Sequence, residues 1–457
     1  MIHRYFVWLH RWTGLLMTAF LVVVGLTGTL LAFRSKIDHL LNPQYYAEGK
    51  PGQTPLDPAT LAERAEALVP QAKPGFFSVG KEQVNISLRF HKNPATGQPY
   101  DFGFDHLILD PYTGRELGRC CAHSNWRVMF MPFVYELHTS LALGNAGAWL
   151  LGIVALVWTL DCFVGFFLTL PRGQGGFWER WKYAWQVKWR ANPFRINFDL
   201  HRAGGLWFWV LLFVFAWSSV MLSLRPVYAR VTKAIFDYRT DDEAIASAIL
   251  PQPLDKPKLG WREAQTLGER EMAEIAAQHG FKIARPYGMA YIPEFGVYTY
   301  AVRGSNDIRG EGWDTSIWID GNTGALRDVS LPSGQHAGNT VSIWLWGLHY
   351  GDIRNFLPYR ILVAFFGLVL TIISVTGVYI WWKKRRGRMS AALAKARIPS
   401  TNGAATIAFE NREEEHMHHR SSLKGIGLTA AERLAVSHSR GDAEQREGER
   451  DAKDNYQ

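Results

Sequence analysis

Four histidines stand at matched positions in the two halves of the sequence. The motif L-H-R-x-x-G occurs twice, 191 residues apart, and contributes His10, Arg11, Gly14, His201, Arg202 and Gly205. An aromatic-x-aromatic-x-L-H motif also occurs twice, 211 residues apart, and contributes His138 and His349. Imidazole is a good iron ligand, and a haem iron with no exchangeable position takes two axial histidines from facing helices. These residue types therefore point to haem ligation and electron transfer.

These histidines flank four long apolar segments. Residues 12–33, 203–224 and 361–382 carry no charge, and residues 148–170 carry only Asp161. A helix needs roughly 20 apolar residues to cross a bilayer, so we expect four transmembrane helices. The first segment is too long for a signal peptide and no small-x-small cleavage site follows it, which predicts an uncleaved anchor.

Lysine and arginine are concentrated on one side of the predicted spans. Seven lie within residues 171–202 and four more at 383–386, so the positive-inside rule makes this side, with both termini, cytoplasmic. The net charge of +9 therefore needs no nucleic-acid partner. The expected order is a first span at 1–34, an outside module at 35–132, a histidine segment with the second span at 133–170, a basic Trp-rich interfacial loop at 171–200, a third span at 201–224, a second outside module at 225–342, a histidine segment with the fourth span at 343–386, and a disordered cytoplasmic tail at 387–457.

The segments outside the membrane resemble two copies of a small α+β module. Asp110-Pro-Tyr-Thr-Gly114 recurs as Asp320-Gly-Asn-Thr-Gly324. Each copy follows an alternating apolar stretch, which predicts a strand that enters a tight turn with a glycine at positive φ. Helical patterns precede both copies, at 56–68 and 261–279. Together with the doubled histidine motifs, this predicts an α-helical membrane protein with four spans, built by internal duplication.

Alternating helix direction gathers the histidines into two pairs. His10 and His201 come to the cytoplasmic face, and His138 and His349 come to the outer face. Two haems stacked across the bilayer would then carry electrons from one face to the other. The alternatives are histidines that serve only as interfacial anchors, or a site for zinc or another ion.

Neighbouring residues fit the haem hypothesis. Glycines one turn after His10 and His201 would leave flat space for a porphyrin: Gly14, Gly204 and Gly205. Arg11 and Arg202 would hold the haem propionates with charge-assisted hydrogen bonds. His123 and His336 form another repeat-related outer pair, which would replace or assist the outer ligands.

Asp161 is a functional candidate because a carboxylate inside a span is costly. It would accept protons from a quinol, or hydrogen-bond to haem or to a hydroxyl group; the alternative is a protonated residue paired within the bundle. Adjacent cysteines seldom bond to each other, so no disulfide is expected from Cys120 and Cys121, and Cys162 is interpreted as a small buried apolar residue.

Two cytoplasmic segments complete the pattern. Tryptophans at helical spacing between basic residues predict an amphipathic helix in the membrane interface: Trp178, Trp181, Trp185 and Trp189. The polar tail contains His416, His418 and His419, an incidental cluster or a metal-binding one.

Over residues 1–388, the doubled L-H-R-x-x-G, D-x-x-T-G and L-H motifs resemble the PepSY-associated transmembrane helix family. That family includes bacterial inner-membrane ferric-siderophore reductases that contain b-type haem. The resemblance implies a multi-pass inner-membrane protein with two haems b per chain, held by the four motif histidines. It also implies reduction of a periplasmic ferric-siderophore and release of Fe(II). The tail departs from the family pattern.

The sequence contains no dinucleotide-binding motif and no P-loop, so electrons would come from a quinol or from a separate cytoplasmic reductase. No catalytic residues are expected beyond the haem ligands. The first rival hypothesis is a non-enzymatic PepSY-type membrane protein that binds peptides or regulates a protease, with structural histidines; it predicts a colourless protein. A metal transporter is disfavoured because the spans offer a single acid to line a pore.

Overall fold

The computed structural model describes residues 1–397 except 50–51, 92–96, 99, 122–123, 241–242 and 244–248. The chain divides into two compact units, Met1–Lys383 and Lys384–Gln457. The first unit holds the apolar helices and both sheets. In the second unit, the described residues belong only to the end of one long helix.

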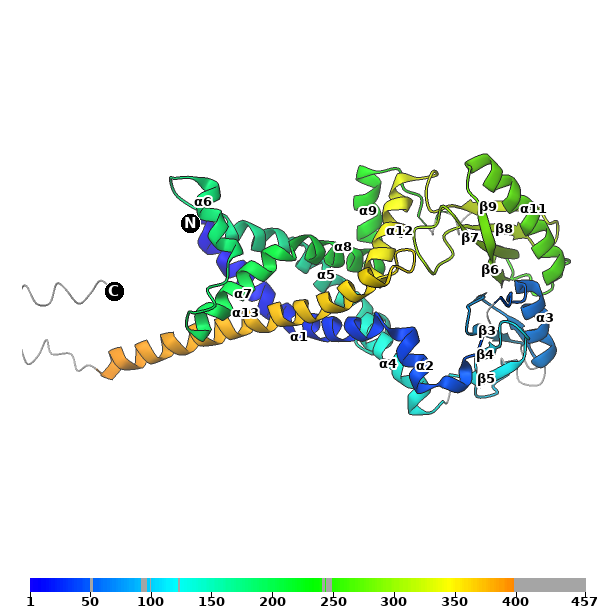
Figure 1. Ribbon diagram of the computed structural model, residues 1–457, viewed down its shortest axis with the longest axis horizontal. Helices are drawn as coiled ribbons and strands as arrows, with labels where there is room; N and C mark the ends of the chain where they lie inside the picture. The colour runs from blue at the N-terminus through cyan, green and yellow to red at the C-terminus, as the bar shows by residue number, and fades with distance from the viewer. Residues whose placement is uncertain are drawn as a thin grey trace, which may run out of the picture. The chain divides into compact units, whose positions relative to one another are not determined.

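The apolar segments form a helical bundle. Three helices are long and apolar enough to cross a membrane: α1 (Ile2–Leu31), α5 (Gly144–Thr169) and α13 (Leu357–Arg397). A fourth candidate is the pair α7 (Pro193–Trp207) and α8 (Trp209–Ser223), which is bent by 68°. Figure 1 shows these helices side by side, and their shared core contains Met17, Leu21, Trp158, Cys162, Leu212, Ala216, Phe366 and Leu370. The chain is therefore a membrane protein with three spans, or four if the bent pair is one span.

The third predicted span is not one continuous helix. Phe208 has φ −104° and ψ 11°, which interrupts the helix between α7 and α8. The indole Nε1 of Trp207 donates to the carbonyl of Trp185 (3.1 Å), and that of Trp209 donates to the carbonyl of Cys162 (2.9 Å). These bonds hold both sides of the break against neighbouring segments and so stabilise the bend.

The sequence predicts that His138 and His349 begin the spans that follow them, but each lies in the last turn of a separate helix. These helices are α4 (Trp126–Ser140) and α12 (Ala337–Tyr350). Each is followed by a residue in the left-handed region, Leu141 at φ 53° and Gly351 at φ 67°. A left-handed residue cannot continue a helix, so the chain turns before each span begins.

Helix limits differ from the sequence prediction at two further places. Between Trp178 and Trp189, helical structure is limited to α6 (Phe177–Trp181) and η2 (Lys182–Trp185), because Gln186 is extended. The predicted amphipathic helix is therefore wrong beyond Trp185. Helix α13 continues to Arg397 through lysine, arginine and alanine, which are good helix formers. The histidine cluster at 416–419 lies outside the described residues.

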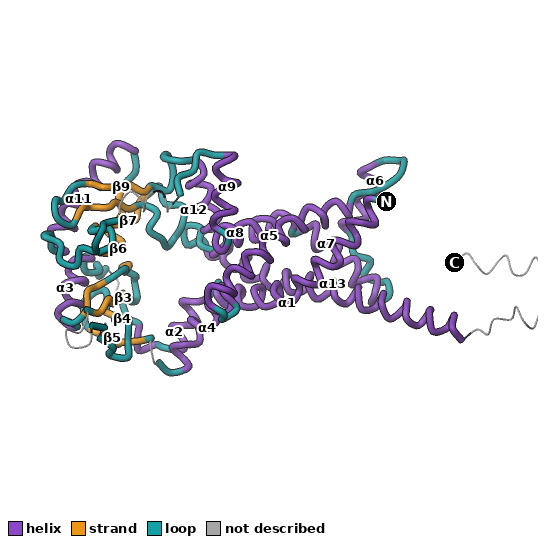
Figure 2. Tube along the Cα trace, turned by 180° about the vertical axis from the view of Figure 1, so that it is seen from behind, coloured by secondary structure: helices purple, strands orange, loops and turns teal. Residues whose placement is uncertain are grey.

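Two antiparallel sheets lie beyond one end of the bundle, as Figure 2 shows. The first has the order β1 (Ala72–Pro74), β3 (Val84–Phe90), β4 (His106–Leu109), β5 (Glu116–Cys120). The second has the order β2 (Phe77–Ser78), β6 (Ile283–Ile292), β7 (Val297–Gly304), β8 (Ser316–Asp320), β9 (Leu326–Ser330). The predicted helical patterns form α3 (Pro58–Leu68) and α11 (Trp261–His279), while α2 (Arg34–Leu41), η1 (Pro43–Tyr45) and α9 (Arg225–Ile235) connect the sheets to the bundle.

The two sheets share one core. Strand β2 comes from the first outside segment but pairs with β6 of the second, with Phe77 opposite Met289. Buried residues of α3, such as Leu61, belong to the same apolar cluster as Trp261 of α11 and Ile317 of β8. The two predicted modules are therefore interlocked through β2.

The two predicted tight turns have the same geometry. Gly114 and Gly324 have φ of 66° and 73°, and each donates its N–H to the backbone carbonyl of the turn aspartate at 2.9 Å. The Asp320 carboxylate also accepts from the backbone of Asn322 and Thr323 and from Arg327 Nε (3.0 Å). Burial alone would raise the pKa of Asp320, but these donors outweigh it and lower the pKa to about 2.

Replacing Asp320 by asparagine is expected to destabilise this turn by about 1–3 kcal/mol at neutral pH, because a charged acceptor is lost. A lowered folded-state pKa means that the stabilisation is present above about pH 4 and is lost as the pH falls through about 2. Hydrogen exchange of the β8 and β9 amides, compared with the unaltered chain at each pH, measures the change. Asp110→Asn is the control, because Asp110 makes the turn bonds without an arginine partner among the described residues. Equal effects in both variants would contradict the role of Arg327.

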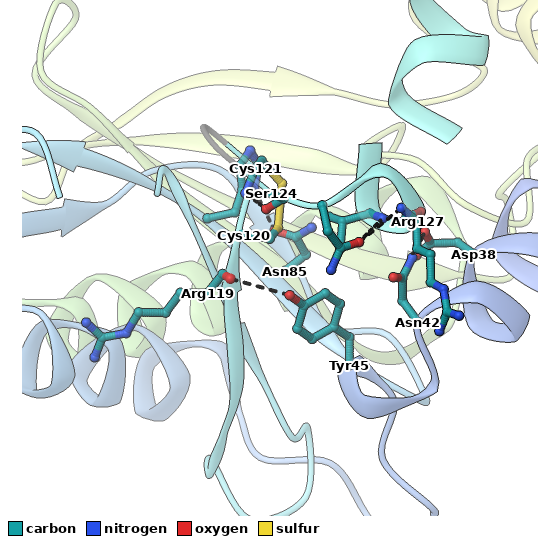
Figure 3. Close-up of a disulfide and its surroundings, with 12 residues drawn as sticks. Asp38, Asn42, Tyr45, Asn85, Arg119, Cys120, Cys121, Ser124 and Arg127 are labelled. Carbon is teal, nitrogen blue, oxygen red and sulfur yellow. Dashed lines mark hydrogen bonds between the residues drawn. A yellow bond between two sulfur atoms is a disulfide. The ribbon is translucent and has the colours of Figure 1, made fainter. Parts of the chain in front are cut away.

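The prediction for the adjacent cysteines is wrong. Cys120 and Cys121 form a disulfide at the end of β5, shown in Figure 3. Cys121 has φ 111°, and its N–H donates to Ser124 Oγ at 2.9 Å. The positive φ of Cys121 brings the sulfur atoms of the two adjacent cysteines together, and this backbone conformation could not be predicted from the sequence. Cys162 is free and buried, as predicted.

Candidate functional site

The structure brings the four motif histidines into two facing pairs. His10 of α1 faces His201 of α7, with ring centroids 6.1 Å apart; these two residues form the first pair. His138 of α4 faces His349 of α12, with ring centroids 6.2 Å apart; these two form the second pair. Each pair joins residues far apart in the chain, so the fold of the bundle creates both arrangements.

In the first pair, the groups that face both Nδ1 atoms accept hydrogen bonds from them. His10 Nδ1 lies 2.9 and 3.1 Å from the two carboxylate oxygens of Asp161. His201 Nδ1 lies 3.0 Å from the backbone carbonyl of Ile373 and 3.2 Å from Thr376 Oγ1, whose own hydrogen goes to the same carbonyl (2.7 Å). A carboxylate and a carbonyl oxygen accept, so each Nδ1 carries the hydrogen and each Nε2 keeps a lone pair.

In the second pair, hydroxyl groups play the same part. His138 Nδ1 lies 3.0 Å from Thr27 Oγ1, and His349 Nδ1 lies 2.8 Å from Ser218 Oγ. Each hydroxyl also reaches a carbonyl of its own helix, at 2.7 and 3.1 Å, and in the tautomer with hydrogen on Nδ1 it donates there and accepts from the imidazole. Among the described residues, none is hydrogen-bonded to an Nε2 atom of the four histidines.

Three of the histidines lie against a glycine of a neighbouring helix. A Cβ atom built on that glycine would meet the Cε1 atom of the ring. The pairs are His10 with Gly165 (3.5 Å), His201 with Gly377 (3.1 Å) and His138 with Gly28 (3.2 Å). The missing side chains let the helices approach and hold the rings in place.

This geometry fits a haem iron between the two rings of each pair. Metal–imidazole bonds of about 2 Å, with about 1 Å more to each ring centre, would separate two axial ring centres by about 6 Å. Next to the first pair, a Cβ atom on Gly14 or Gly205 would meet nothing within 4 Å, which leaves the space that a flat macrocycle needs. Gly204 instead packs on Ile373 at 3.7 Å and offers less room.

The number of protein ligands also favours haem over zinc. In the described part of the chain, no group of three or more His, Cys, Asp or Glu side chains could hold a metal ion. A structural zinc site uses four protein ligands and a catalytic site uses three. A haem brings four equatorial nitrogens of its own, so two histidines complete its coordination.

The two motif arginines differ. The Nε atoms of Arg11 and Arg202 are both buried without a hydrogen-bond partner within the residues that the structure describes. The difference lies at Nη2 of Arg202, which donates to the carboxylate of Asp199 (2.8 Å) and to the carbonyl of Tyr183 (2.7 Å). Asp199 is fully buried and also bonds Arg195. Arg11 is therefore better placed to hold a propionate, and Arg202 anchors the Trp-rich loop.

The structure does not bring the other predicted histidine to the second pair. His336 caps the start of α12 and bonds Asp237 at 2.7 Å. Thirteen residues separate it from His349, which is about 20 Å along a helix at 1.5 Å per residue. His123 lies outside the described residues.

Several residues of the site were not identified from the sequence. Thr27 and Ser218 are 191 residues apart, the same spacing as His10 and His201, so the internal repeat could have identified them as equivalent positions. Gly165 and Gly377 are 212 residues apart, close to the 211 of the L-H motifs. The Ile373 carbonyl has no such clue, because every residue carries one.

A comparison with protein families agrees with the membrane fold. A family model described as the PepSY-associated TM region matches residues 7–384, which is most of the chain. A search of curated proteins found no match.

Proposed function

This chain belongs to the PepSY-associated TM family, and from that premise we propose that it is a di-haem membrane oxidoreductase. It would pass electrons across the bilayer to a ferric-siderophore in the periplasm and release Fe(II) for iron uptake. One observation carries the proposal: two pairs of facing histidines have every Nδ1–H engaged, which leaves four Nε2 lone pairs for two irons.

The spacing of the two histidine pairs supports electron transfer through the membrane. Bound haem would supply a one-electron Fe(III)/Fe(II) couple at each pair. His10 and Thr27, which contact the two sites, are 17 residues apart on α1, or about 25 Å along the helix. This is close to the roughly 30 Å of bilayer hydrocarbon. Buried apolar residues of the bundle, such as Met17 and Leu21, lie between these two positions on α1.

Aromatic rings lie within this interval. The Phe215 ring is 5.3 Å from His349 and 4.7 Å from Phe366, measured between ring centroids. The Phe366 ring lies 6.4 Å from that of Phe208, at the bend between α7 and α8. These uncharged aromatic side chains form a continuous series of ring contacts that runs from the second pair towards the first. Electrons could follow this series without placing a charged side chain in the membrane.

The distribution of lysine and arginine supports the proposed orientation of the protein in the membrane. Basic residues of the Trp-rich loop and of 383–386 favour a cytoplasmic first pair and cytoplasmic termini. The second pair and both sheets would then face the periplasm of a bacterial inner membrane. A disulfide such as Cys120–Cys121 suits that oxidising compartment. The doubled motifs support an origin by internal duplication.

Family resemblance supports the substrate class, a ferric-siderophore. His10 with His201 and His138 with His349 would hold the two haems, which would supply outer-sphere electron transfer to the chelate. His138 and His349 would hold the second haem, and the two sheets would bind the chelate next to it. A quinol or a separate cytoplasmic reductase would supply the electrons.

The test is the dithionite-reduced minus oxidised spectrum of the detergent-purified protein, with a haem-to-protein ratio. We expect sharp low-spin b-type bands at close to two haems per chain. The reduced protein should then be reoxidised by a ferric-siderophore, with Fe(II) trapped by a ferrous chelator. A colourless protein from haem-replete cells would leave the histidines structural and would contradict the proposal.

A further inference from the structure

The four histidines differ in the charge of the group that holds Nδ1. His10 alone is bonded to a carboxylate, that of Asp161. The other three are bonded to neutral groups, namely the Ile373 carbonyl and the hydroxyls of Thr376, Thr27 and Ser218. The first pair therefore has a carboxylate next to one ligand, and the second pair has neutral partners at both ligands.

Orientation of the ring does not require this charge. Asp161 precedes Gly165 by four residues, and Ile373 precedes Gly377 by four. Both glycines lie against the Cε1 atom of a histidine in the first pair, so Asp161 and Ile373 occupy equivalent positions on α5 and α13. On α13 two neutral groups, the Ile373 carbonyl and the Thr376 hydroxyl, hold His201 without a charged partner.

A buried carboxylate is also expensive. The side chain of Asp161 is 9% exposed and lies within an apolar span. Burial of an ionised group in such surroundings is unfavourable unless it is well paired. His10 and the Thr13 hydroxyl, which donates to Oδ1 at 3.0 Å, supply that pairing. The Asp161 carboxylate is unfavourable to bury and is not needed to orient the His10 ring. This suggests that its function is to alter the electronic properties of His10 as a ligand.

We infer that Asp161 lowers the reduction potential of haem at the first pair below that at the second pair. The inference rests on the proposed function. A carboxylate that accepts the Nδ1–H raises the basicity of the ligating Nε2. Its negative charge also stabilises ferric iron more than ferrous iron, and second-shell hydrogen bonding and net charge are among the factors that set such potentials.

The consequence is a direction for electron flow. Haem held by His10 and His201 would give up one electron, and haem held by His138 and His349 would take it up, with no transfer of an atom or proton. The donor is the quinol or cytoplasmic reductase, and the acceptor is the ferric chelate. Asp161 is a positioning residue, because it acts on the iron through His10.

The test measures midpoint potentials from the visible haem bands of the purified full-length protein. The His349→Ala background isolates the haem of the first pair. In that background, Asp161→Asn should raise the midpoint by at least 59 mV, a tenfold change in the equilibrium constant for one electron. Asp161→Glu, which keeps the charge, should restore most of the original value. In a His201→Ala background, Ser218→Ala is the matched control at the second pair and should shift the midpoint less.

An unchanged midpoint in Asp161→Asn, or an equal shift in Ser218→Ala, overturns the inference while leaving the proposed function intact. If Asp161→Asn loses the haem, Thr13→Val decides. Without the Thr13 hydroxyl, the Asp161 carboxylate accepts one hydrogen bond fewer and interacts more strongly with His10. The midpoint potential of the first haem should then fall, and an unchanged midpoint overturns the inference. A colourless unaltered protein would overturn the proposed function and the inference together.

Discussion

His349→Ala is expected to lower the haem content from about two per chain to about one. The alanine removes one of two axial nitrogens, and Ser218 loses the imidazole N–H that it accepts. Iron held by His138 alone would have an open axial position, which favours high-spin iron and loss of haem. The reduced spectrum should keep the low-spin bands of the first pair at half the intensity. The measurement is haem per protein, by alkaline pyridine extraction and amino-acid analysis.

The chain offers a matched control on the same helix. His336 caps α12 and bonds Asp237 instead of a second histidine, so His336→Ala should retain both haems. His138→Ala should behave like His349→Ala, and reduction of an external ferric chelate should be lost in both. Full haem content in both variants would contradict the ligand assignment. A normal size-exclusion profile excludes misfolding as the cause of any loss.

The sequence was most informative where a pattern is local or repeated. An uncharged run of 22 residues reports a span directly, because the bilayer sets the length of an apolar helix. The D-x-x-T-G turns were predictable for a similar reason, since the glycine at positive φ and the aspartate that accepts backbone N–H groups are close in sequence. The pairing of His10 with His201 followed from counting spans between doubled motifs.

The features that the sequence did not predict depend on backbone conformation or on contacts between segments that are far apart in the sequence. The break after α4 occurs at Leu141, a residue type that rarely adopts positive φ and so gives no warning. Strand β2 has only two residues and joins a sheet made mostly from the second outside segment. The contact between Asp161 and His10 joins residues 151 apart, so the acid was visible as an anomaly without its partner.

The crossing of α1 and α13 is a close contact between helix backbones. A Cβ atom on Gly25 would lie 2.7 Å from the Gly367 carbonyl oxygen, and one on Gly367 would lie 2.5 Å from the Gly25 carbonyl oxygen. Thr29 Oγ1 donates to the Ala364 carbonyl at 3.0 Å across the same contact. Small residues allow such close approach of helices in membranes.

Gly25→Leu is therefore expected to force α1 and α13 apart, because the Gly367 carbonyl oxygen that it meets belongs to the backbone and cannot rotate away. Overpacking of this kind costs about 1–3 kcal/mol and more where backbone is displaced. Unfolding in detergent, followed by size exclusion after heating, should begin several degrees lower. Leu26→Val is the control, because Leu26 is adjacent but 46% exposed.

The haem content of Gly25→Leu separates a general packing defect from loss of a single ligand. Helix α1 carries His10 of the first pair and Thr27, which holds His138 of the second. Helix α13 carries the Ile373 carbonyl that holds His201. Displacing these helices alters the supports of both pairs, so both haems should be lost together, in contrast to the loss of one in His349→Ala. Retention of two haems at an unchanged unfolding temperature would show that the two helices do not cross at these glycines.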